Sequence, residues 1–105
     1  MIAPGVALGP GKADLLQAIQ ETGSISAGAR RMSMSYKRAW YLVETLNSHF
    51  GQPLVVSTKG GRAGGGAKLS ELGVEILAAY REMERLTDKA IAPVLRRVRR
   101  KTSSL

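Results

Sequence analysis

Residues 23–40 constrain this chain most, because they predict two short helices joined by a tight turn. Ser24 and Ser35 are both suited to cap a helix N-terminus, since a serine hydroxyl accepts a hydrogen bond from a backbone N–H in the first turn. The small residues at 27–29 allow a second helix to cross at close range. Residues 33–34 then form the turn, so a helix-turn-helix unit is expected here.

The second of these helices, expected over residues 35–50, combines a cationic start with an apolar stripe. Apolar residues recur at three- and four-residue spacing and predict an inward face. A helix that enters the major groove of DNA needs polar and cationic side chains at its N-terminal end, with the opposite face braced by another helix. The candidate DNA contacts are Ser24, Ser26, Ser35, Tyr36, Lys37, Arg38 and Tyr41.

Two aromatic residues and the basic face leave alternatives open. Tyr36 could contact a thymine methyl group or a phosphate, or it could be a lid on the core. Trp40 is expected to be half-buried rather than to contact a base. A solvated basic face on an ordinary helical domain is the alternative to the DNA-reading interpretation.

The remaining segments predict a winged helix-turn-helix, a mainly α fold with a small β-hairpin. A helix is expected over residues 12–21, ending at Gly23, which tolerates positive φ. The β-branched run at 53–57 can pair with a shorter strand at 67–69. Residues 1–11 suit a short edge strand or an ordered arm. The expected division is a winged helix-turn-helix over 1–70, with the wing at about 55–69, a long helix over 71–92, and a basic tail over 93–105.

The glycine-rich loop between the two strands resembles a phosphate loop only superficially. Gly61 and Gly66 match the outer glycines of that motif, but Ala67 and Lys68 follow where Lys and then Ser or Thr are required. A wing explains the loop better, because glycines allow close approach to a sugar-phosphate backbone. Its candidate phosphate contacts are Lys59, Arg62 and Lys68. A disordered loop is the alternative.

The helix from residue 71 carries apolar residues that step alternately by four and three. A helix over 71–92 is about 33 Å long, which exceeds what so small a domain covers. We therefore expect an overhang that pairs with a second copy and sets two reading helices about 34 Å apart; packing back on the body is the alternative. The expected dimerisation residues are Leu72, Ile76, Ala79, Met83 and Leu86.

Pro93 should end or kink this helix, because proline lacks the backbone N–H. The basic residues that follow are expected to form a frayed end. A solvated tail, a phosphate contact and a subunit contact all remain open for them.

Composition narrows the possible function classes. The chain has 105 residues, room for one domain, and a formal net charge of +8, which favours polyanionic partners. The sequence has no cysteine and a single histidine, His49, so no metal site and no cofactor are expected. The carboxylates form no acid–base pair, so we do not expect an enzyme. No apolar run reaches membrane-spanning length, and no secretory signal is evident, so a cytoplasmic protein without a membrane partner is expected.

Four stretches together resemble the N-terminal DNA-binding domain of ModE-type molybdate-responsive transcription regulators, which is similar to the LysR-type winged helix. They are residues 15–31, 34–40, 60–66 and 69–73, and the resemblance covers about residues 8–85. It implies that Ser35, Tyr36, Lys37 and Arg38 begin the recognition helix, that residues 60–66 form the wing, and that the long helix dimerises.

The sequence departs from the family pattern in two respects. Gly28 stands where the family usually has alanine, and neither the molybdate-binding domains nor a Ser-Arg-Asn-Gln type oxyanion motif is present in this sequence. We therefore expect a homodimeric, sequence-specific regulator of transcription that binds double-stranded DNA and is linked to molybdenum or oxyanion metabolism. It acts either alone or with a separate signal-sensing partner.

Two other functions compete with this one. The first is a small oxyanion (molybdate) sensor or carrier that uses the wing and its cations. The second is a helical protein–protein adaptor that uses the face of the long helix.

Overall fold

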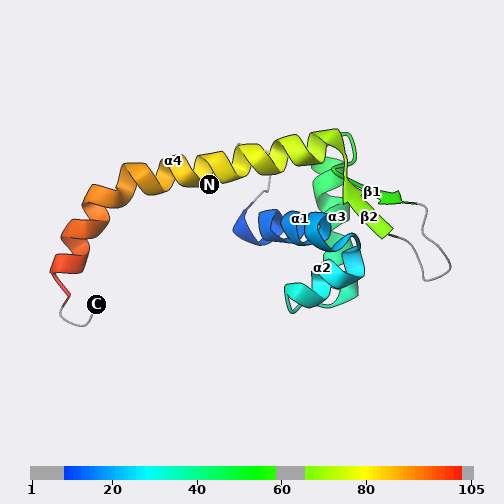
Figure 1. The fold of residues 1–105 in the computed structure, drawn as a ribbon, viewed down its shortest axis with the longest axis horizontal. Coiled ribbons are helices and arrows are strands. Elements are labelled where there is room, and N and C mark those ends of the chain that lie inside the picture. Colours follow the sequence, from blue (N-terminus) through cyan, green and yellow to red (C-terminus); the bar gives the residue numbers. More distant parts are fainter. Residues whose placement is uncertain (1–8, 59–65, 103–105) are drawn as a thin grey trace.

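The fold is mainly helical, with one two-stranded antiparallel hairpin, as predicted. A computed structural model describes residues 9–58 and 66–102. Three helices and the hairpin form a body, and a long fourth helix crosses the body and continues beyond it (Figure 1). The elements are α1 (Pro10–Thr22), α2 (Ile25–Arg31), α3 (Tyr36–Phe50), β1 (Val55–Thr58), β2 (Gly66–Leu69) and α4 (Glu71–Arg100).

Helix α1 lies at the centre of the body and is buried along one side. Leu15, Leu16 and Ile19 are fully buried and belong to the same core as residues of α3 and the hairpin. The helix begins at Pro10, two residues before the expected start, because proline is preorganised for the first helical turn, where its missing N–H is not needed. Gly23 ends it with φ 84°, and its N–H donates to the Ile19 carbonyl at 2.8 Å.

The turn between α2 and α3 lies at residues 33–34, as predicted. Its two closing hydrogen bonds run from Met34 N–H to the Ala29 carbonyl at 3.0 Å and from Ser33 N–H to the Arg30 carbonyl at 3.1 Å. This is the Schellman arrangement, which requires a left-handed residue after the helix. Ser33 supplies that residue with φ 57°, a conformation that glycine adopts more easily.

The hairpin pairs Val55 with Leu69 and Thr58 with Gly66 at its two ends. The first strand begins at residue 55 rather than at 53, because the two preceding residues are engaged elsewhere. The Pro53 carbonyl accepts from the Ser70 hydroxyl at 2.7 Å, and the Leu54 carbonyl accepts from Ser70 N–H at 2.9 Å. These bonds fix the start of α4 against the turn that precedes β1.

A further hydrogen bond ties the hairpin to the turn between the first two helices. The backbone N–H of Ala67 donates to the Gly23 carbonyl at 2.8 Å, which joins β2 to the turn between α1 and α2. The hairpin therefore has a fixed position relative to the helix-turn-helix unit.

Helix α4 packs on the body only at its beginning. Ser70 caps it, with the hydroxyl accepting from Gly73 N–H at 3.0 Å, and its buried residues are Gly73, Leu77 and Tyr80. Almost every described residue after Glu84 is exposed, so the second half overhangs the body. The predicted overhang is confirmed.

The expected end of this helix near residue 92 is wrong, and residues 93–100 are helical rather than a frayed tail. The helix continues through Pro93 to Arg100. A proline inside a helix removes one backbone donor and is commonly accommodated by bending. The helix axis turns in its orange part, around this proline (Figure 1), so the expected kink is present. Among the described residues, no helix is both long and apolar enough to cross a membrane.

Candidate nucleic-acid interface

The N-terminal end of α3 presents its side chains to solvent. The Ser35 hydroxyl accepts a hydrogen bond from Arg38 N–H at 3.0 Å and caps the helix. Ser35, which the sequence predicted as a DNA contact, therefore stabilises the start of α3. Tyr36, Lys37 and Arg38 are all exposed, and Tyr36 has 53% of its surface accessible. Because the predicted inward stripe is buried, the exposed end is part of a firmly held helix; the stripe consists of Ala39, Leu42, Val43 and Leu46.

Exposed side chains also lie along the face of α3 that is opposite its buried stripe. Lys37 and Tyr41 are four residues apart and lie roughly opposite the buried stripe, and Tyr41 has 65% of its surface accessible. Glu44 and Ser48 are exposed on the same face and were not predicted as contacts. Glu44 follows Tyr41 by three residues and Ser48 follows Glu44 by four, a spacing that places them on that face.

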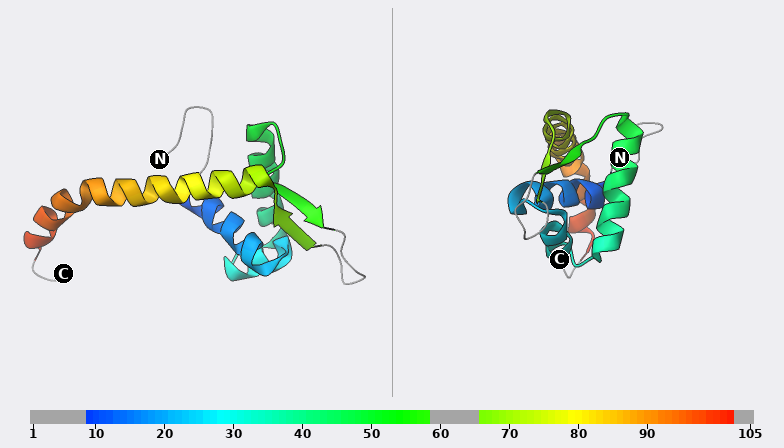
Figure 2. Two further views of the ribbon diagram at one scale, coloured as in Figure 1. Left: turned by 45° about the horizontal axis from the view of Figure 1, so that its top comes forward. Right: turned by 90° about the vertical axis from the view of Figure 1, so that its right-hand side faces the viewer.

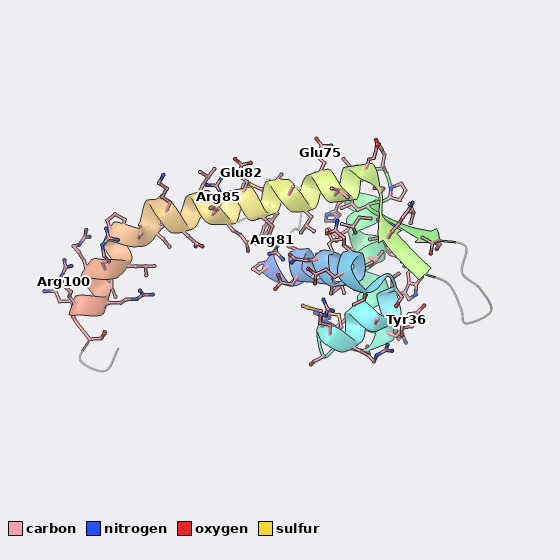
Figure 3. The ribbon with its side chains drawn as sticks, in the orientation of Figure 1. Tyr36, Glu75, Arg81, Glu82, Arg85 and Arg100 are labelled. Carbon is pink, nitrogen blue, oxygen red and sulfur yellow. The ribbon has the colours of Figure 1, made fainter. Side chains whose placement is uncertain are left out.

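Tyr36 and Trp40 form an edge-to-face pair, with ring centroids 6.4 Å apart and planes at 85°. Trp40 is half-buried and packs against the core, as expected, whereas Tyr36 faces outward (Figure 3). The two rings border a shallow depression of about 120 Å³ at the junction of α2, α3 and the hairpin. Its lining residues are Ile25, Ser26, Tyr36, Trp40, Ser57, Gly66 and Ala67. The depression joins the exposed end of α3 to the hairpin in one surface.

The two serines of the α2 region that were predicted as DNA contacts make different hydrogen bonds. Ser24 is half-buried, and its hydroxyl accepts from Ala27 N–H at 2.9 Å, so it caps α2. Ser26 is exposed, and its hydroxyl accepts from Arg30 at 3.1 Å. Arg30 is exposed as well and was missed among the candidate contacts, although its position four residues after Ser26 places it on the same helix face.

The predicted wing residues are only partly described. Lys68 is exposed in β2, opposite Val56. Lys59 and Arg62 lie outside the described residues.

One arginine holds the long helix on the body. The Arg81 guanidinium donates to Asp14 at 2.8 Å, to Gln17 at 2.6 Å and to Glu84 at 3.0 Å (Figure 3). The hydrogen bond to Asp14 raises the pKa of Arg81 above its ordinary value, and the hydrogen bond to Glu84 makes a smaller contribution in the same direction. Arg81 therefore positions α4 on α1 rather than contributing a free cation.

The expected dimerisation residues fall into two groups. Leu72 and Ile76 are half-buried against the domain's own core, whereas Ala79, Met83 and Leu86 are exposed. The buried residues of this part of α4 are Gly73 and Leu77, the immediate neighbours of Leu72 and Ile76, together with Tyr80. The part of the expected surface that lies open to a second copy therefore begins at Ala79.

The described residues contain no group of three or more histidine or carboxylate side chains that could hold a metal ion. Every buried polar side-chain atom in this part of the chain has a hydrogen-bond partner.

Comparison with known proteins identifies the domain. The model of the family described as bacterial regulatory helix-turn-helix protein, lysR family, matches residues 12–74. The chain is 45% identical over 80 residues to the molybdenum-pterin-binding protein MopB of Rhodobacter capsulatus, covering 76% of this chain and 30% of that protein. It is 36% identical over 81 residues to the DNA-binding transcriptional dual regulator ModE of Escherichia coli, covering 77% of this chain and 31% of the relative.

The structural comparison agrees with the family match. Full-length LysG from Corynebacterium glutamicum superposes with a TM-score of 0.64 and 26% identity, over 87% of this chain and 29% of that one. The chain spans about 30% of the length of the relatives it matches. On the evidence of the matched residues and the observed fold, this chain belongs to the lysR family of bacterial regulatory helix-turn-helix proteins.

Proposed function

We propose that this chain is a sequence-specific regulator of transcription that binds double-stranded DNA through the N-terminal end of α3. The observation that carries the proposal is the exposure of Tyr36, Lys37 and Arg38 on a helix whose opposite face is buried. Lysine and arginine donate to guanine O6 and N7 in the major groove, and each good bidentate contact discriminates by roughly 1 to 3 kcal/mol. The relative in Escherichia coli is named as a DNA-binding transcriptional regulator, which supports the proposal.

The hairpin and α2 supply contacts that position the domain without reading sequence. Arg30 and Lys68 are exposed cations close to the depression beside Tyr36, since Arg30 donates to the lining residue Ser26 and Lys68 directly follows the lining residue Ala67. Contacts from such residues to phosphates fix the orientation of a protein on the duplex. We include Ser26, Lys59 and Arg62 in this group.

We further propose that the regulator is a homodimer paired along the overhanging part of α4. Met83 and Leu86 have 38% and 51% of their surfaces exposed, respectively, on a helix that leaves the body after Glu84. Two copies paired in this way present two reading helices, and a spacing of about 34 Å would match successive major grooves.

The link to molybdenum rests on the names of relatives, of which MopB is described as molybdenum-pterin-binding. We propose that the chain serves molybdenum or oxyanion metabolism, holds no cofactor itself, catalyses no reaction and receives its signal from a separate partner. The exposed Lys37 and Arg38 at the start of α3 favour DNA, because cationic side chains in the first turn of a recognition helix can reach base edges in the major groove.

Selection of bound sites from a random duplex library tests the proposal. We expect an enriched inverted repeat, since a two-fold symmetric dimer reads two matching half-sites. Equal affinity for the selected and random duplexes at every salt concentration would contradict sequence-specific binding. Calorimetry with molybdate, tungstate and sulfate tests the rival, because a saturable heat with molybdate alone would favour an oxyanion carrier.

A further inference from the structure

The last turns of α4 form a separate cationic surface. Five of the six residues from 96 to 101 are cationic, and no carboxylate follows Asp88 in the sequence. We call this surface the terminal cluster; it consists of Arg96, Arg97, Arg99, Arg100 and Lys101. All five are exposed, and none of them takes part in the ion pairs of the described residues, which use Arg31, Arg81 and Arg85.

The middle of the same helix differs in its charge balance. Between residues 81 and 89, three cations alternate with three carboxylates, and Arg81 and Arg85 both pair within the protein. Cations near a helix C-terminus interact favourably with the helix dipole, but each contributes only about 0.3 to 1 kcal/mol, and the effect is confined to the last turn. Helix stability therefore does not account for five cations among six consecutive residues.

The curvature of α4 carries the terminal cluster toward the side of the body on which α2 and Tyr36 lie (Figure 1 and Figure 3). In Figure 1 the red end of α4 lies lower than its start, at about the height of α2. Figure 3 labels Arg100 at this lowered end and Tyr36 on the lower part of the body. The right-hand view of Figure 2 shows the same displacement from a perpendicular direction. The bend around Pro93 thus lowers the cationic end toward the level of the reading helix.

The positions around the helix separate two surfaces. At 100° per residue, Arg96, Arg99 and Arg100 lie opposite the side that carries Val94 and Val98. The side with Val94 and Val98 continues the exposed apolar face that carries Met83. If a second copy pairs along this apolar face, the three arginines face away from the partner. Dimerisation and the binding of a polyanion are therefore compatible.

We propose that the terminal cluster binds phosphates of duplex DNA outside the stretch read by α3. The inference rests on the proposed DNA-binding function. The overhang from Arg85 to Arg100 is about 24 Å long, which corresponds to about seven base pairs at 3.4 Å each. A duplex carries one phosphate per about 1.7 Å of axis, so a compact group of five cations meets several of them at once.

The test compares the salt dependence of binding for the wild-type chain and the variant R96Q/R97Q/R99Q/R100Q/K101Q, in which glutamine preserves helix propensity. The probes are a long duplex that carries both half-sites of the selected site with the base pairs between them, and a short duplex of one half-site that ends where the stretch read by α3 ends. Each phosphate contact contributes about 0.9 to the slope of log affinity against log salt, so the loss of three contacts lowers the slope by about 2.7 on the long duplex. On the short duplex the two proteins should agree.

The matched control is R85Q/K89Q, which removes two cations from the same overhang and should leave the slope unchanged. Far-UV circular dichroism verifies the helix content, and the milder variant R99Q/R100Q/K101Q serves if the fivefold variant is unfolded. Equal slopes for wild type and variant on the long duplex would overturn the inference. So would dissociation of the variant into monomers in sedimentation, which would assign the cluster to a second copy. Absence of any duplex binding by the wild type would instead refute the proposed function.

Discussion

Replacing Gly73 with alanine should destabilise the domain, although alanine normally favours a helix. Gly73 is buried in the first turn of α4, and a Cβ atom there would overlap the Leu54 carbonyl oxygen and lie 3.0 Å from the carbonyl carbon and 3.2 Å from Leu69 Cβ. The carbonyl cannot move away freely, because it accepts from Ser70 N–H, and Leu54 N–H donates to Asn47 at 2.7 Å. A flexible side chain would give way, whereas this backbone is held on both sides.

The magnitude follows from two opposing terms. Alanine gains about 1 kcal/mol over glycine in a helix interior, and overpacking costs about 1 to 3 kcal/mol or more. Because the overlap involves backbone atoms, we expect the upper end of that cost and a net loss of about 2 kcal/mol. For a domain of this size, such a loss lowers the Tm by roughly 8 to 16 °C.

Urea unfolding followed by circular dichroism measures this change. The matched control is Gly11→Ala in α1, where a Cβ atom meets nothing within 4 Å, and we expect equal or higher stability than wild type. If Gly73→Ala were as stable as Gly11→Ala, the close packing of α4 on the Leu54 turn would be refuted.

Three further predictions concern the turn, the interhelical ion pair and the dimer. Ser33→Gly should stabilise the domain by up to about 1 kcal/mol, because φ is 57° there; an unchanged urea midpoint would contradict this. Arg81→Met should lower the free energy of unfolding by about 1 kcal/mol in thermal unfolding, because the ion pairs of Arg81 are partly exposed to solvent. A much larger loss would contradict the small contribution expected of these ion pairs. Met83→Asp and Leu86→Asp should each shift sedimentation toward monomers while leaving the monomer folded; an unchanged dimer would exclude this face.

The sequence predicts features set by near neighbours. Ser24, Ser35 and Ser70 each precede a helix by one residue and accept from an N–H three residues later, a local pattern that the sequence displays directly. The inward stripe of α3 and the left-handed Gly23 are local in the same sense. This is why the order of the elements and the position of the turn were predicted.

The features that sequence reasoning missed depend on contacts between distant residues. Asp14 and Arg81 are 67 positions apart, and Ser70 reaches back 17 positions to Pro53, so no periodicity signals either pair. Leu72 and Ile76, which were expected to dimerise, pack against the domain's own core, since the neighbouring residues Gly73, Leu77 and Tyr80 hold this part of α4 on the body.

The central claim is that sequence discrimination resides at the start of α3. The direct measurement is the ratio of affinities for the selected and random duplexes at one fixed salt concentration, for wild type, Lys37→Ala, Arg38→Ala and the control Lys89→Ala. We predict that at least one of the α3 variants lowers the ratio roughly 5- to 150-fold, corresponding to the loss of one base contact worth about 1 to 3 kcal/mol, and that the control leaves it unchanged. An unchanged ratio in both α3 variants would contradict the account.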